Sequence, residues 1–129
     1  MGTHCHLGIR TSANDILGCY VHYDGYPEHM IPAVRNFLAN KTTTCLLLLV
    51  RQAQGRGGLV SFKGYEWELS EGMWGPEAYD NDRFGTDVHY RYTVDLTTAN
   101  LTAELLNACT GEWERVTEKN RSGSEFDTD

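Results

Sequence analysis

Two neighbouring segments near the start of the chain, residues 4–10 and 16–23, alternate between apolar and polar side chains. The apolar positions recur at every second residue: Cys5, Leu7, Ile9, Leu17, Cys19 and Val21. A period of two residues is typical of a β-strand that buries one face. The polar residues 11–15 between the segments predict a turn, so the two segments should form a β-hairpin.

The apolar faces of the two strands constrain how the hairpin pairs. Placing Ile9 opposite Leu17 aligns the apolar residues of both strands, whereas a one-residue slip would mix the two faces. Slips of two residues keep the faces matched and remain open. The favoured register also pairs the polar side chains, His4 with His22 and His6 with Tyr20.

Two helices are predicted after the hairpin. Apolar residues at helical spacing predict a helix over 29–39. Pro32 is tolerated only in the first turn of a helix and therefore favours a start near residue 30. The leucine-rich segment 45–54 could be a helix or a buried strand. The threonines before it can cap a helix, and the polar run at its end also favours a helix.

The rest of the chain is rich in short alternating segments. Strands are predicted at 59–62, 65–69, 88–96, 101–105 and 113–116. The last three should form a meander, and residues 70–85 predict a long loop. Strands, then helices, then strands favour an α+β fold: an antiparallel sheet made of the N-terminal hairpin and the C-terminal meander, with one or two helices packed on one face. We expect one domain over residues 1–117 and a disordered polar tail at 118–129.

The chain of 129 residues is acidic, with 18 acidic and 11 basic side chains and a formal charge of −7. Because non-specific nucleic-acid affinity comes from Lys and Arg, generic binding to DNA or RNA is not expected. The charge would, however, suit an acidic mimic of DNA that occupies a DNA-binding enzyme. The sequence shows no secretory signal and no apolar run of membrane-spanning length. We therefore expect a cytoplasmic protein with free, buried cysteines and no membrane partner.

The polar face of the predicted hairpin carries His4, His6 and His22. Three imidazoles with an open fourth position are a ligand set of catalytic zinc sites, so this face is a candidate metal site. A histidine-rich surface that faces solvent and a surface that stacks on a ligand are the alternatives. No cofactor is otherwise indicated, and the absence of a Gly-x-Ser-x-Gly motif favours a binding protein over an enzyme.

The junction between the second strand and the first helix gathers aromatic and polar side chains. Asp, Gly and Pro within residues 24–27 predict a turn, which could serve only to direct the helix. Alternatively, Tyr rings could stack on a ligand while the helix N-terminus attracts an anion. The glycine-rich residues 55–58 add an arginine but lack the Gly-Lys-Ser/Thr ending of a P-loop. The candidate ligand-binding residues are Tyr20, His22, Tyr23, Asp24, Tyr26, His29 and Arg56.

A further signal lies in two short segments, Met-Gly-Thr at residues 1–3 and His-Tyr-Asp-Gly-Tyr-Pro at residues 22–27. Through them roughly residues 1–50 of the chain resemble a family of small uncharacterised bacteriophage proteins, which typically begin Met-Gly-Thr-Arg and contain His-Trp-Asp-Gly-Tyr-Pro. This chain has His4 in place of the arginine and Tyr23 in place of the tryptophan. The resemblance implies a phage accessory protein that acts in the host bacterial cytoplasm.

These features favour a counter-defence protein that binds and sequesters a small nucleotide-derived ligand or immune signal. A protein-binding inhibitor or acidic mimic of a host nucleic-acid enzyme is one alternative, and a small metal-dependent hydrolase is another. The expected partners are a nucleotide-like small molecule or a host protein. A sheet with one open face also leaves surface for a homo-oligomer.

Overall fold

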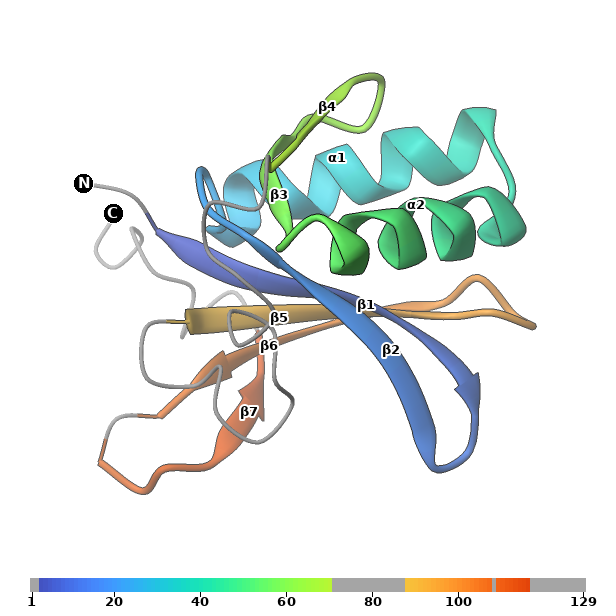
Figure 1. Ribbon diagram of the computed structural model, residues 1–129. Helices are drawn as coiled ribbons and strands as arrows, with labels where there is room; N and C mark the ends of the chain where they lie inside the picture. Colours follow the sequence, from blue (N-terminus) through green and yellow to red (C-terminus); the bar gives the residue numbers. More distant parts are fainter. Residues whose placement is uncertain (1–2, 71–87, 108, 117–129) are drawn as a thin grey trace.

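The computed structural model describes residues 3–70, 88–107 and 109–116. The described elements, in chain order, are β1 (His4–Ser12), β2 (Asp15–Val21), α1 (Pro27–Asn40), α2 (Thr43–Gly55), β3 (Leu59–Phe62), β4 (Trp67–Leu69), β5 (Val88–Asp95), β6 (Leu101–Leu106) and β7 (Trp113–Arg115). The strands form one sheet in the order β4-β3-β2-β1-β5-β6-β7. Figure 1 shows both helices on the same side of this sheet. The predicted α+β class is confirmed. Apart from Ser70, the predicted loop at 70–85 lies outside the described residues, as does the predicted tail at 118–129.

The N-terminal hairpin forms in the predicted register. Ile9 lies opposite Leu17, and Cys5 lies opposite Val21. β1 continues to Ser12 and β2 begins at Asp15, so the connection is shorter than the predicted polar turn, whereas β2 ends at Val21 and not at residue 23 as predicted. A register shift between Arg10 and Ser12 marks a bulge next to this connection. Matching of apolar faces was therefore sufficient to determine how these two strands pair.

The sheet is mixed, which corrects the prediction of a purely antiparallel sheet. β2 and β3 run parallel, and so do β1 and β5. The chain leaves β2, forms both helices and returns to start β3, and a crossover of this kind makes neighbouring strands parallel. β2 occupies one edge of β1, and β5 pairs with the other edge. The meander of β5, β6 and β7 thus joins the hairpin through a parallel contact.

The two helices lie close to their predicted positions. α1 begins at Pro27 rather than near residue 30, because proline fits the first helical position, where its missing N–H would have no partner. Pro32 consequently lies inside the helix rather than in its first turn. Segment 45–54 is helical, as favoured. The Thr42 hydroxyl accepts a hydrogen bond from the backbone N–H of Cys45 (3.2 Å) and caps α2.

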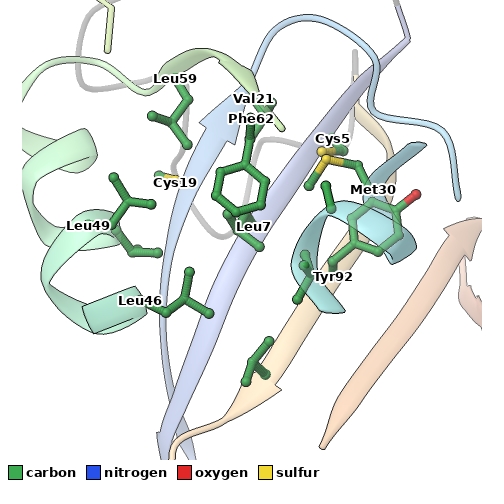
Figure 2. Close-up of a cluster of buried hydrophobic side chains, with 14 of the residues drawn as sticks. Cys5, Leu7, Cys19, Val21, Met30, Leu46, Leu49, Leu59, Phe62 and Tyr92 are labelled. Atoms are coloured by element: carbon green, nitrogen blue, oxygen red, sulfur yellow. The ribbon is translucent and has the colours of Figure 1, made fainter. Parts of the chain in front are cut away.

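The hydrophobic core lies between the helices and one face of the sheet (Figure 2). The fully buried side chains of the central hairpin include Cys5, Leu7, Cys19 and Val21. Burial raises the pKa of the Cys19 thiol to about 12, so this thiol stays neutral and behaves as an apolar group. Burial also raises the pKa of Cys5, with a smaller contribution from Cys19. The expectation of buried thiols is confirmed for these two cysteines only, because Cys45 and Cys109 are exposed.

Candidate functional site

The three histidines of the hairpin do not converge on one point. The rings of His4 and His22 stack with their centroids 4.6 Å apart and an angle of 19° between the planes. Nδ1 of His4 donates to the carbonyl oxygen of His22 (2.6 Å), and Nδ1 of His22 shares a hydrogen bond with the Tyr20 hydroxyl (2.8 Å). His6 is buried, and its ring lies against Gly18, where an added Cβ would collide with it.

The predicted metal site is therefore not formed by these three histidines. Stacked imidazoles present their faces to each other, whereas metal ligands must direct ring nitrogens toward a common ion. Within the described part of the chain, no group of three His, Cys, Asp or Glu side chains could hold a metal ion.

Tyr20, His22 and Tyr23 do meet, in a cluster of rings that also includes His4. The Tyr23 ring stands edge-on to His22 with centroids 4.6 Å apart, and the Tyr20 ring lies 5.8 Å from His22. Partial burial, and secondly the neighbouring His4, lower the pKa of His22 below its ordinary value of 6.5. The ring cluster thus favours the neutral imidazole and offers aromatic faces more than charge.

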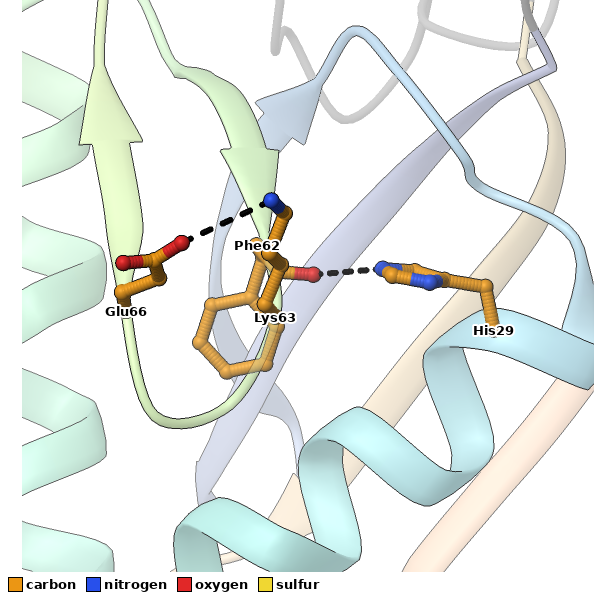
Figure 3. A network of polar contacts seen from close by, with 4 residues as sticks. All are labelled: His29, Phe62, Lys63 and Glu66. Carbon is orange, nitrogen blue, oxygen red and sulfur yellow. Dashed lines mark hydrogen bonds and ion pairs between the residues drawn. The ribbon is translucent and has the colours of Figure 1, made fainter.

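The remaining predicted residues make contacts that serve the fold. Nε2 of His29 donates to the backbone carbonyl of Phe62 (2.7 Å) and ties α1 to β3, beside the Lys63–Glu66 ion pair of the β3–β4 turn (Figure 3). The Tyr26 ring lies 6.1 Å from the His29 ring.

Asp24 and Arg56 also lie at structural transitions. Asp24 has a φ of 60°, a left-handed conformation that suits the turn before α1. Arg56 follows the last residue of α2, where its backbone N–H caps the helix. The structure therefore gathers some of the predicted residues in the ring cluster and gives the others separate contacts.

A polar hollow of about 650 Å³ lies on the sheet face that points away from the core. Along β1 and β5 its residues alternate with the buried apolar ones, which places them on the opposite face of the same strands. The lining residues are His6, Arg10, Asn14, Ile16, Arg91, Thr93, Asp95, Thr98, Asn100, Thr102, Glu104 and Arg115. The volume is in the range of small-molecule sites, about 300–1,000 Å³.

The strand registers explain why the sheet is hollowed at this place. One outer row across the sheet contains His6, Arg91, Glu104 and Arg115. The opposite outer row contains Arg10 and Asp95. The middle row contains Gly18, Gly8, Thr93 and Thr102. The His6 ring and Ile16 cover the Gly18 and Gly8 positions of this row, whereas Thr93 and Thr102 form the low floor of the hollow between the longer charged side chains on either side.

Arg91 is held by residues from two neighbouring strands. Its Nε donates to Oε1 of Glu104 (2.6 Å), and its Cζ lies 4.4 Å from the centroid of the Trp113 ring. An ion pair fixes one edge of the guanidinium group, and a cation–π contact fixes its plane.

The other acidic group of the hollow, Asp95, is fixed by the β5–β6 turn. Its Oδ1 accepts hydrogen bonds from the backbone N–H groups of Thr98 (3.0 Å) and Thr97 (2.9 Å). These bonds, with a smaller contribution from the positive charge of Arg10, hold the pKa of the Asp95 carboxyl below its usual value. The lining thus combines three arginines with two acids, an excess of positive charge on an acidic chain.

The sequence predictions missed the arginines and threonines of this hollow. Gly8 and Gly18 lie inside predicted strands and face each other, but neither residue lines the hollow. Glycine within a strand often marks a place where another group approaches the backbone closely. Here both positions are crowded by side chains: an added Cβ would collide with the His6 ring at Gly18 and lie 3.0 Å from Ile16 Cγ2 at Gly8.

No helix in the described ranges is long and apolar enough to cross a membrane. Comparisons of the chain with protein-family models, with curated proteins and with solved structures give no match.

Proposed function

We propose that the protein binds and sequesters a small nucleotide-derived ligand, and that the polar hollow on the sheet is the binding site. The observation that carries this proposal is the lining, in which arginine, asparagine and threonine side chains surround a low floor. Guanidinium groups match phosphoryl oxygens, and amides and hydroxyls match the edges of a sugar or base. The proposed site thus differs from the strand-to-helix junction that the sequence indicated.

The polar groups of the hollow suit holding a ligand more than converting it. Asp95 and Glu104 already accept hydrogen bonds from the protein, so their carboxylates are committed to fixing the turn and Arg91. Such fixed groups reduce the entropy lost on binding. The resemblance to small phage proteins supports a counter-defence role in the host bacterial cytoplasm, where the protein would lower the free concentration of an immune signal.

Calorimetry and thermal-shift measurements with cyclic nucleotides and ADP-ribose derivatives test this function. The informative variant is Thr102→Trp, because Thr102 belongs to the middle row and an indole there fills the hollow. The matched control is Thr44→Trp, because Thr44 is exposed on α2. We expect a panel member to bind the wild-type protein and the control variant, and Thr102→Trp to lose at least about tenfold in affinity.

Two results would refute the proposal. One is a folded wild-type protein that binds no member of the panel. The other is a ligand whose affinity is unchanged by Thr102→Trp, because that ligand would bind elsewhere on the molecule.

A further inference from the structure

We infer that Arg91 is the anchor for the anionic group of the ligand, with Glu104 and Trp113 as positioning residues. This inference rests on the proposed function and deepens it, because it names the chemical group recognised and its place in the hollow. The ligand it predicts carries a phosphoryl group at the row of Arg91 and its neutral part toward the row of Arg10.

The first argument is the geometry of the guanidinium group. Glu104 takes the Nε donor and Trp113 covers one face of the plane. Among the described residues, the two Nη groups of Arg91 donate no hydrogen bond. The side chain of Arg91 is 33% exposed, so the group is partly shielded but still reachable from solvent. The result is an arginine whose orientation is set by the protein and whose outer donors are available to a ligand.

The second argument is chemical complementarity. The two Nη groups of a guanidinium form a planar pair of donors that matches two oxygens of one oxyanion. Holding this pair in place before binding lowers the entropy that binding costs. A lysine at the same position would carry the charge but could neither offer paired donors nor stack in the same way on the indole.

The third argument is the contrast with the arginine of the opposite row. Nη1 of Arg10 already donates to the backbone carbonyl of Ala13 (3.0 Å), at the tip of the hairpin. Both arginines have a carboxylate neighbour, Asp95 for Arg10 and Glu104 for Arg91, so the contrast lies in which guanidinium donors are already used and not in the net charge. That end of the hollow is completed by the amides of Asn14 and Asn100. It therefore suits a neutral, hydrogen-bonding part of the ligand.

The strand registers give the distance between the Arg91 end and the Arg10 end of the hollow. Arg91 and Asp95 are four residues apart on β5, which corresponds to about 13 Å of strand rise. A nucleoside carrying one or two phosphates spans a length of this order.

The test compares Arg91→Lys with Arg51→Lys, an exposed arginine on α2. The probes are the best ligand of the nucleotide panel, measured by calorimetry, and inorganic phosphate, measured by phosphorus NMR line broadening. We expect Arg91→Lys to weaken both by about tenfold or more, and Arg51→Lys to leave both unchanged. Circular dichroism of each variant verifies that it is folded.

Tryptophan fluorescence provides a second readout that does not depend on how Arg91→Lys folds. A phosphoryl group at Arg91 should change the emission of the wild-type protein, because the indole of Trp113 lies against the guanidinium. Trp113→Phe should still bind phosphate but lose this response. A response that survives Trp113→Phe would place the anion elsewhere and overturn the inference.

The two proposals fail in different ways. A nucleotide that is displaced by Thr102→Trp but binds Arg91→Lys at full affinity overturns the anchor and leaves the proposed function standing. Phosphate binding at Arg91 without any nucleotide binding supports the anchor and refutes the function. Absence of binding by both probes to the folded wild-type protein overturns both.

Discussion

Tyr92→Phe is the substitution for which the structure gives the most definite expectation. Tyr92 is fully buried on β5, and its hydroxyl donates to the backbone carbonyl of Gly25 (2.7 Å). Gly25 in turn donates through its N–H to the carbonyl of Thr3 (2.7 Å). These two bonds attach the turn before α1 to the sheet. The substitution removes one hydroxyl and leaves the ring, so it changes the hydrogen bond with little change in packing.

The expected loss of stability follows from leaving the buried carbonyl of Gly25 without the Tyr92 hydroxyl as a hydrogen-bond donor. A neutral hydrogen bond contributes about 0.5–1.5 kcal/mol net, and an unsatisfied buried polar group costs about 1–3 kcal/mol. We therefore expect Tyr92→Phe to lower the free energy of unfolding by about 1–3 kcal/mol. Urea denaturation measures it, and an unchanged m value would show that the unfolding transition is otherwise the same. The matched control is Tyr65→Phe, because Tyr65 is 69% exposed and should change stability by less than about 0.5 kcal/mol.

A second variant localises the effect to the turn. An added Cβ at Gly25 would lie 2.7 Å from both Thr3 O and Cys5 Cβ, so Gly25→Ala must displace the turn. In the Gly25→Ala background, Tyr92→Phe should lower the free energy of unfolding clearly less than in the wild-type protein. The reason is that the hydrogen bond between the Tyr92 hydroxyl and the Gly25 carbonyl is already strained or broken there. A loss below about 0.5 kcal/mol in the wild-type background, or equal costs in both backgrounds, would refute this role of Tyr92.

Two further outcomes follow from titratable groups. The pKa of His22 is lowered in the folded protein, so the unfolded chain binds the proton more tightly, and stability should fall as the pH drops below about 6.5. His22→Gln should reduce the difference between urea midpoints at about pH 7.5 and about pH 5.5, and an identical difference would contradict this. For the thiols, a disulfide reagent should modify exposed Cys45 and Cys109 in the native protein but reach Cys5 and Cys19 only after unfolding. Cys45 should react first near neutral pH, because hydrogen bonds from Thr42 lower its pKa; rapid reaction of all four thiols would contradict the buried core.

The elements that could be predicted from the sequence depend on local patterns. The hairpin register followed from apolar faces only a few residues apart, and a one-residue slip would have exposed Leu7 and Cys19. Strand β3 was predicted at its observed bounds, Leu59–Phe62. The second helix was favoured because a threonine could cap it, and Thr42 does so. In each case the information lies within one segment or two adjacent ones.

The predictions that failed required knowledge of distant partners. The start of α1 was placed too late because Pro32 was read only through the local rule for prolines, whereas the helix tolerates it in its interior. The three histidines share a face as expected, but their rings are directed by contacts with Tyr20 and Gly18 rather than toward a common ion. Side-chain direction is decided by the packing around each ring, which alternation along a strand does not describe.

By itself, the sequence determined the α+β class, the hairpin and the pairing of its two strands, because apolar periodicity acts between neighbouring segments. Only the tertiary structure decided where a ligand could bind. His6 and Arg91 lie 85 positions apart in the chain and become neighbours because β5 pairs in parallel with the free edge of β1. That choice of edge joins the polar faces of the hairpin and the meander into one lined hollow. It depends on how the whole chain covers the apolar face of the sheet, which no local pattern specifies.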